Sequence, residues 1–395
     1  MTRLVVQQHH EVTMPRHFSP DEYQTRVERA RAALSRNGLD AMLLFAPENH
    51  YWLTGYDTFG FAMFQCMVLT QTGDIHLLTR RADRLQAKLT STLGNRNIHI
   101  WSEVEGADPI ADLSHLLADL ELTGGKIGFE SKTAGLTDFW GHRLRQVFPT
   151  APDFSDLISD LRRDKSEAEI AMHRRAAALS DDALDAALAA TKAGAFEGHI
   201  LADMQSAVLK GGGDYAGNEF ILGSGEAALL CRSASGRRHL TAQDQMTIEW
   251  SGVYARYHAA MMQTLIVGNA SANHRRMYEA ASEALSACEA SIHPGAPMGD
   301  VFDAHARVFD AHGFSNARLQ ACGYGMGAVF APIWVDFPMF YEGNPQIMRA
   351  NQVFFLHMIL MDADSGDAMC LGHSVLCTNT GTERLSRHAP QLFEL

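Results

Sequence analysis

The sequence TIEWSGVYARYHAAMMQT, at residues 247–264, is the most informative part of the chain. Its first half alternates polar and apolar residues, which is typical of a half-buried strand. Gly252 allows a turn, and residues 253–258 are then expected to return as the second strand of a hairpin. The hairpin would carry one acid and three side chains that can bind anions or move protons: Glu249, Arg256, Tyr257 and His258. Such a set suits nucleophilic or acid/base chemistry, although a solvated strand edge with one ion pair would have the same composition.

The length and composition of the chain indicate a two-domain globular protein. A chain of 395 residues is long for a single core. Its 46% hydrophobic and 20% charged residues are ordinary values for a globular protein. The net charge of −13 and the lack of a basic run argue against a nucleic-acid partner, because phosphate binding needs a surplus of Lys and Arg.

No targeting or membrane segment is evident in the sequence. No apolar run is long enough to span a bilayer, and the first 15 residues lack the apolar core of a signal peptide. Six cysteines are scattered without a CxxC pair, as expected for buried thiols in a reducing compartment. We therefore expect a cytoplasmic protein with no membrane partner.

The spacing of apolar residues divides the chain into two halves. Up to residue 154, helical stretches, including a capped helix over 19–37, alternate with short strands, which indicates an α/β domain. A boundary is expected near residues 157–166, because Ser166 and Glu169 form a capping-box pattern before a long helix. The second half repeats paired helices followed by strands, which indicates an internally duplicated α+β domain. We place the domains at residues 1–160 and 161–395.

The hairpin also resembles that of a known family. Its outline, acid–x–x–Gly–x–x–x–Arg–Tyr–His, is similar to the metal-independent branch of the creatinase/aminopeptidase P superfamily, and most similar to ectoine hydrolase. Further matches follow in order along the chain, at residues 53–57, 65–66, 212–215 and 323–324. The resemblance implies a creatinase-like α/β N-terminal domain and an α+β catalytic domain with the pita-bread fold. It also implies a homodimer that acts on a small-molecule substrate.

The resemblance identifies the positions at which metallopeptidases of this fold bind two metal ions. Those positions here hold Glu249, Ala260, Tyr324, His357 and either Gly372 or His373. Only Glu249 is still an acid, whereas a pair of Mn, Co or Zn ions needs several carboxylates. We therefore expect no metal pair and no other cofactor. A single Zn or Fe ion held by Glu249, His357 and His373 is the alternative.

The resemblance also implies a catalytic mechanism. In the similar enzymes a glutamate at the position of Glu249 attacks the carbon of a cyclic amidine, and water then hydrolyses the covalent intermediate. A carboxylate is a weak nucleophile, but a protonated C–N carbon is strongly electrophilic and a desolvated site strengthens the attraction. The catalytic histidine of those enzymes falls at Arg232, which stays protonated and is expected to bind a substrate carboxylate. Proton transfer is assigned to His258, His357 or His373.

Six aromatic residues are candidates for the wall of the substrate site: Tyr215, Tyr257, Tyr324, Trp334, Phe59 and Phe61. Tyr215 belongs to a Gly-rich loop, 211–225, that has no phosphate-binding motif and is expected to approach a small ligand closely. Trp334 lies on a long irregular segment of the kind that lines pockets. In creatinase-like dimers a first-domain loop covers the partner's active site, which implies that role for Phe59 or Phe61, with plain packing as the alternative.

Together these features predict a metal-independent hydrolase of a C–N bond in a small cyclic amidine, amide or guanidino metabolite. Two other classes of function remain open. One is a metal-dependent Xaa-Pro peptidase or lyase with altered ligands, and the other is a small-molecule-binding homologue without catalysis. The retention of Glu249 argues against a loss of catalysis, because an unpaired buried acid is costly.

Overall fold

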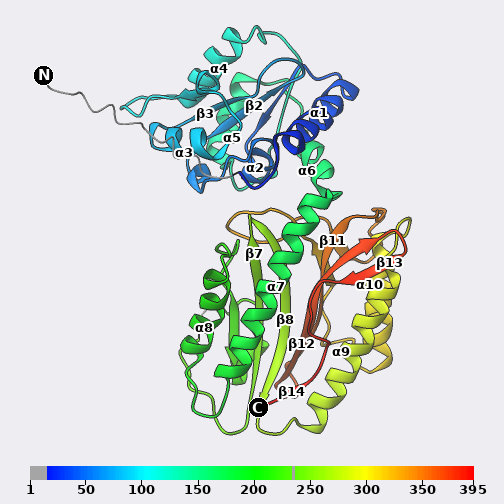
Figure 1. Ribbon diagram of the computed structural model, residues 1–395. Coiled ribbons are helices and arrows are strands. Elements are labelled where there is room, and N and C mark those ends of the chain that lie inside the picture. Colours follow the sequence, from blue (N-terminus) through cyan, green and yellow to red (C-terminus); the bar gives the residue numbers. More distant parts are fainter. Residues whose placement is uncertain (1–15, 234–235) are drawn as a thin grey trace, which may run out of the picture. The chain divides into compact units, whose positions relative to one another are not determined.

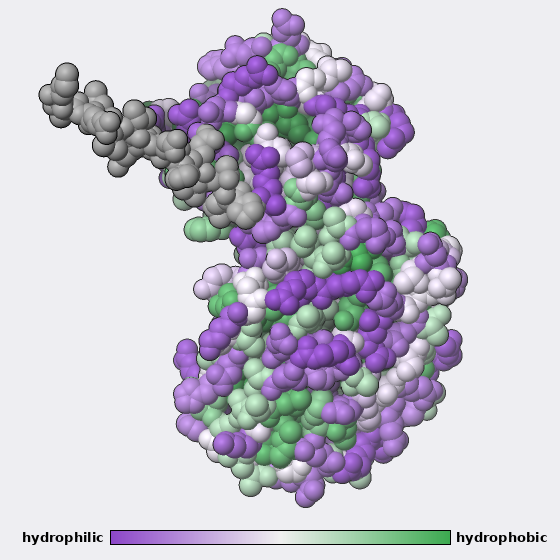
Figure 2. All heavy atoms as spheres, viewed as in Figure 1, coloured by the Kyte–Doolittle hydropathy of each residue, from purple (hydrophilic) through white to green (hydrophobic). Residues whose placement is uncertain are grey.

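The computed structural model describes residues 16–233 and 236–395. The first 15 residues, whose composition argued against a signal peptide, lie outside the described part. The chain divides into two compact units, residues 1–161 and 162–395, and each builds its own sheet (Figure 1). In Figure 2 hydrophilic residues predominate on the visible face. Among the described residues, no helix combines the length and the apolar composition that crossing a membrane requires.

The first unit is a five-stranded mixed sheet between two layers of helices. Its strands lie in the order β4-β3-β2-β1-β5, and the β1–β5 and β3–β4 pairs are parallel. Met42 of β1 packs in one core with α1, whereas Leu43 packs in the other core with α4, because successive residues of a strand face opposite sides. The strands are β1 (Ala41–Leu44), β2 (Cys66–Thr70), β3 (His76–Thr79), β4 (Ile98–Ile100) and β5 (Ile127–Phe129). The helices are α1 (Pro20–Arg36), α2 (Pro47–Thr54), α3 (Arg84–Thr90), α4 (Pro109–Asp119), α5 (Asp138–Val147) and α6 (Asp156–Arg163), the last of which runs into the second unit.

The second unit is built on a larger, almost entirely antiparallel sheet. Seven strands follow the order β10-β9-β11-β12-β8-β7-β6, with β13 added to β12 and β14 added in parallel to β8. In chain order, the first five strands of this sheet are β6 (Ile221–Ser224), β7 (Asp244–Tyr254), β8 (Tyr257–Val267), β9 (Ala321–Gly325) and β10 (Met339–Tyr341). The remaining strands are β11 (Gln352–Asp362), β12 (Asp367–Thr378), β13 (Gly381–Arg384) and β14 (Phe393–Glu394).

Two pairs of helices cover this sheet: α7 (Glu167–Ala190) with α8 (Glu197–Lys210), and α9 (Ala272–Ser291) with α10 (Met298–Ala311). The predicted capping box is present at the start of α7. Trp250 and His373 belong to one row across the sheet, in which Met261 pairs with both. The Trp250 indole donates to the carbonyl of Ser180 in α7, and His373 pairs with Glu289 in α9. The two helices therefore lie on the same face of the sheet.

β7 and β8 form the predicted hairpin, but the predicted position of its turn is wrong. The turn lies at Ala255 and Arg256, whose φ angles of +50° and +65° are typical of a two-residue hairpin turn. Gly252 lies inside β7, opposite Ala259. A Cβ atom at Gly252 would stand 2.1 Å from the carbonyl oxygen of Ala176 in α7. Glycine is needed there because α7 approaches the sheet closely, and not because the chain turns.

Candidate active site

One row of residues across the second sheet holds the centre of the candidate site. Glu249 on β7 stands opposite Met262 on β8, Met262 stands opposite Gly372 on β12, and Gly372 stands opposite His357 on β11. Cross-strand partners point to the same face of a sheet. This face is the one opposite to α7 and α9, because the neighbouring row containing Trp250 points toward those helices.

Glu249 is a buried acid whose carboxylate meets a tyrosine hydroxyl. Tyr324 Oη donates to Glu249 Oε1 at 3.4 Å, and Trp334 Nε1 donates to Tyr324 Oη at 2.7 Å. Because the hydroxyl accepts from the indole, its own proton stays directed at Glu249. Burial raises the pKa of Glu249 to about 7, with the charge of Arg232 and the Tyr324 hydroxyl acting in the opposite direction. Glu249 is therefore divided between its acid and carboxylate forms at neutral pH.

His357 supplies a neutral imidazole to the same face. Burial lowers its pKa to about 4, so the ring carries no charge at neutral pH. The ring centroid lies 5.7 Å from that of Tyr324 and 5.6 Å from that of Phe355. Within the described part of the chain, the buried Nδ1 atom of His357 has no hydrogen-bond partner. A buried imidazole nitrogen of this kind is suited to a substrate group or to a proton in transit.

Arg232 adds a positive charge beside this cluster. Its side chain is exposed, and its charge lowers the pKa of both Glu249 and His357. Guanidinium groups remain protonated and bind carboxylates through two parallel hydrogen bonds. The arrangement thus offers an anion-binding group at the exposed side of a buried acid.

Sequence reasoning missed three residues at this site. Phe355 stands opposite Tyr324 and packs against it with a centroid distance of 5.4 Å. Burial raises the pKa of Cys231 and Cys370, and the Glu249 charge acts in the same direction on both thiols. They stay protonated at neutral pH and are poor nucleophiles. Strand alternation could have identified Phe355 and Cys370, because each lies two residues from a position already singled out.

The sequence predicts His373 in the site, but the structure places its side chain on the other face of the sheet. Its row partners are Leu356 and Met261, so its side chain points to the helix-covered face. There its Nε2 lies 2.6 Å from Glu289 Oε1. The position in line with Glu249 and His357 is Gly372. A shift of one residue along a strand exchanges the two faces of a sheet, and this removes His373 from the candidate chemistry.

Two residues of the hairpin are also tied to structural partners. His258 Nδ1 lies 2.8 Å from the carbonyl of Arg256, and its Nε2 accepts a hydrogen bond from Gly217 N at 2.9 Å. Both ring nitrogens of His258 are therefore occupied, and burial lowers its pKa to about 4, so the neutral ring holds a loop in place. Tyr257 donates its hydroxyl proton to Glu169 Oε1 in α7 at 2.7 Å. Its predicted contact with substrate is therefore replaced by a contact with a helix.

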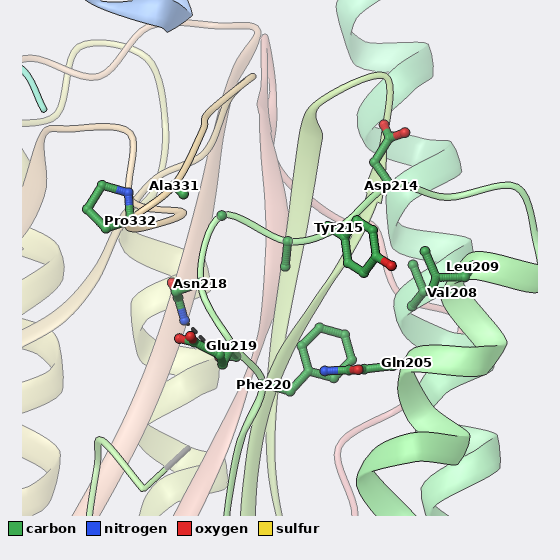
Figure 3. A pocket seen from close by; sticks show the side chains of 12 residues that line it. Gln205, Val208, Leu209, Asp214, Tyr215, Asn218, Glu219, Phe220, Ala331 and Pro332 are labelled. Carbon is green, nitrogen blue, oxygen red and sulfur yellow. Dashed lines mark hydrogen bonds between the residues drawn. The ribbon is translucent and has the colours of Figure 1, made fainter. Parts of the chain in front are cut away.

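The remaining predicted residues fall into two groups. Tyr324 and Trp334 join the Glu249 cluster, as described above. Tyr215 is 76% exposed and lines a separate cavity between α8 and the segment 214–220 (Figure 3). Phe59 is 84% exposed and Phe61 is partly buried, both in the first unit. The homodimer, and the cover that Phe59 or Phe61 would give a partner's site, stay predictions.

The residues present do not suit a metal pair of the kind that the resemblance implies. The corresponding positions hold one acid and one imidazole, together with Ala260, Tyr324 and Gly372. Across residues 16–233 and 236–395, no three His, Cys, Asp or Glu side chains come close enough together to hold a metal ion. The single-ion alternative required His373, whose side chain points to the opposite face.

Comparison with known proteins finds matches over nearly the whole chain. The model of metallopeptidase family M24 matches residues 171–379, and the model of the creatinase/prolidase N-terminal domain matches residues 26–163. Ectoine hydrolase from Halomonas elongata is 26% identical, over 97% of this chain and 99% of its own length. The hydrolase/peptidase y4tM from Sinorhizobium fredii is 25% identical, over 94% and 96% respectively. The crystal structure of dipeptidase PepE from Mycobacterium ulcerans has a TM-score of 0.83 at 21% identity, and the match covers 96% of this chain and 99% of that one.

Proposed function

The chain belongs to metallopeptidase family M24, and from this premise we propose that it hydrolyses a C–N bond in a small cyclic amidine, amide or guanidino compound without a metal ion. Glu249 acts as the nucleophile or as the general base. The observation that carries the proposal is a buried acid of pKa about 7 that accepts from Tyr324, which in turn lies beside His357, at a site that lacks the other carboxylates of a metal pair. The similarity to ectoine hydrolase supports this class of substrate.

The proposed reaction begins with a cyclic amidinium whose ring carbon is electron-poor. The Glu249 carboxylate forms a C–O bond to that carbon, one ring C–N bond breaks, and the released nitrogen takes the proton of the other amidine nitrogen. Water then attacks the same carbon and releases Glu249 as a carboxylate; one proton of the water restores the N–H of the amide product, and the other protonates the released amine. If Glu249 acts instead as a base, it removes a proton from the attacking water, a role for which a pKa near the operating pH is favourable.

The neighbouring residues have separate roles in this proposal. Tyr324 donates a hydrogen bond to Glu249 and orients the carboxylate, while Trp334 fixes the Tyr324 hydroxyl. His357 is neutral and offers its Nδ1 to the substrate or to the water. Arg232 binds an anionic group of the substrate outside the buried cluster. A zwitterion or a carboxylate-bearing cyclic amidine has a negative group for Arg232 and a positive group for Glu249.

Turnover of a panel of cyclic amidines and guanidino compounds, including ectoine and hydroxyectoine, tests the proposal. We expect hydrolysis that persists in EDTA and in protein from which metal has been removed, as verified by elemental analysis. Glu249→Gln should lower kcat by about a thousandfold or more, with little change in Tm. Glu226→Gln makes the same chemical change at an exposed acid outside the cluster and should retain activity.

The two alternatives give different results in the same experiment. A metal-dependent Xaa-Pro peptidase would cleave Xaa-Pro dipeptides, lose activity in EDTA and regain it with Mn, Co or Zn. A non-catalytic homologue would bind a member of the panel with no turnover in either the parent protein or Glu249→Gln. Either result would overturn the proposed metal-independent hydrolysis.

A further inference from the structure

A cavity of about 390 Å³ lies in the second unit, apart from the Glu249 cluster (Figure 3). One wall is α8, the opposite wall is the segment 214–220, and Ala331 and Pro332 complete the lining. Neither Glu249, Tyr324 nor His357 contributes to it. The volume is sufficient for a small organic molecule.

The walls of this cavity are largely apolar. Val208 and Leu209 come from α8, and Phe220 and Pro332 come from the other elements of the lining. Phe220 and Gln205 are both part of the lining (Figure 3). Such walls favour a ligand with an apolar or aromatic body over a fully hydrated ion.

The charge of the lining has one sign only. Asp214 and Glu219 are both acidic, and none of the twelve lining residues is Lys, Arg or His. Asp214 already accepts a hydrogen bond from the backbone N–H of Arg256, so its carboxylate serves the hairpin turn. Glu219 is exposed and is the acid placed to meet a ligand. A positively charged group is therefore favoured over a neutral or negative one.

Tyr215 provides a further element of recognition. This large aromatic side chain is 76% exposed and lines the cavity together with residues of α8 (Figure 3). The faces of aromatic rings attract cations, and covering an exposed ring with a ligand also removes apolar surface from water.

We propose that this cavity is a second ligand site that binds a small organic cation with an apolar body, such as an aromatic amidinium or amine. Glu219 pairs with the cationic group, and Tyr215 and Phe220 contact the apolar body. The site is separate from the catalytic cluster but adjoins it, because Asn218 of its lining accepts a hydrogen bond from the backbone N–H of Trp334 at 3.2 Å.

Benzamidine and benzamide are suitable probes, because they have nearly the same shape and differ in charge. Isothermal titration calorimetry on the full chain should show benzamidine binding at least tenfold more tightly than benzamide. Glu219→Gln should abolish that preference, and Tyr215→Ala should weaken the binding of benzamidine. Asp203→Asn removes a charge from an exposed position on α8 that does not line the cavity, and should leave binding unchanged.

The Glu249 cluster is also acidic, so the two sites must be distinguished. Glu249→Gln should bind benzamidine with unchanged affinity, whether or not the proposed hydrolysis is correct. Loss of binding in Glu249→Gln would place benzamidine at the catalytic cluster and overturn the inference. Undetectable benzamidine binding, equal affinity for the two probes, or full binding by Glu219→Gln would overturn it equally.

Discussion

At the scale of single residues, burial determines the chemistry of the site. Burial raises the pKa of Glu249 to about 7 and lowers that of His357 to about 4. The two shifts have one cause, because a poorly solvated environment disfavours the charged form of either group. At neutral pH the site therefore contains a partly ionised acid and an uncharged imidazole, the protonation states that the proposed hydrolysis uses.

Tyr324→Phe is expected to change the pH dependence of activity. Loss of the hydroxyl removes a hydrogen bond that lowers the pKa of Glu249, so the pKa rises further. Because the carboxylate is the reactive form, the acid limb of the kcat/KM profile should move to higher pH, with activity at pH 7 reduced by roughly threefold to tenfold. Tyr341→Phe alters a tyrosine that is 46% exposed, and its profile should match that of the parent protein. An unshifted profile in Tyr324→Phe would show that the hydroxyl does not act on Glu249.

At the scale of elements, the sequence identified the strands more reliably than the faces of those strands. The second half of the chain is predicted to repeat paired helices followed by strands, and β11 and β12 are two of the strands found there. Both strands are covered on each side, so no alternation of polar and apolar residues shows which side chains face the helices. The choice between Gly372 and His373 therefore depended on pairing with β8 and β11, which only the three-dimensional arrangement supplies.

His357→Gln and His373→Gln test this difference between the two faces of the sheet. We expect His357→Gln to lower kcat by about a hundredfold or more, because it removes the only imidazole in the row that contains Glu249 within the described residues. His373→Gln should keep kcat within about threefold and lower Tm, since its side chain contacts Glu289 in α9. Steady-state kinetics and thermal unfolding of both variants provide the measurement. A greater loss of kcat in His373→Gln than in His357→Gln would contradict the assignment of faces.

At the scale of the whole molecule, the predicted superfamily and fold class are confirmed, while several details of the site are not recoverable from the sequence. Ordered matches along the chain were sufficient to identify the family, because they sample many elements at once. The roles of His258 and Tyr257 could not be predicted in the same way. Both carry groups typical of catalysis, yet their partners, Gly217 and Glu169, lie 41 and 88 residues away. Long-range hydrogen bonds of this kind leave no periodic pattern in a sequence.

The molecule also contains several buried neutral histidines, and their number predicts a loss of stability in mild acid. Burial lowers the pKa to about 3 for His173 and His305, and to about 4 for His50, His258 and His357. In the unfolded chain the pKa of histidine is about 6.5. Below that pH the unfolded chain binds protons that the folded chain does not, so the free energy of unfolding should fall as pH decreases from about 6.5 toward 4.

His305→Leu isolates one part of this effect. His305 is fully buried beside Phe302 and Phe309, and among the described residues neither of its ring nitrogens has a hydrogen-bond partner. Replacing it removes one proton-binding group of the unfolded chain, so the loss of stability between pH 7 and pH 5 should be smaller by about 2 kcal/mol than in the parent protein. Chemical denaturation of both proteins at the two pH values measures the difference. An identical loss in both would show that His305 is already protonated in the folded molecule or is hydrated there, and that its burial does not contribute to acid sensitivity.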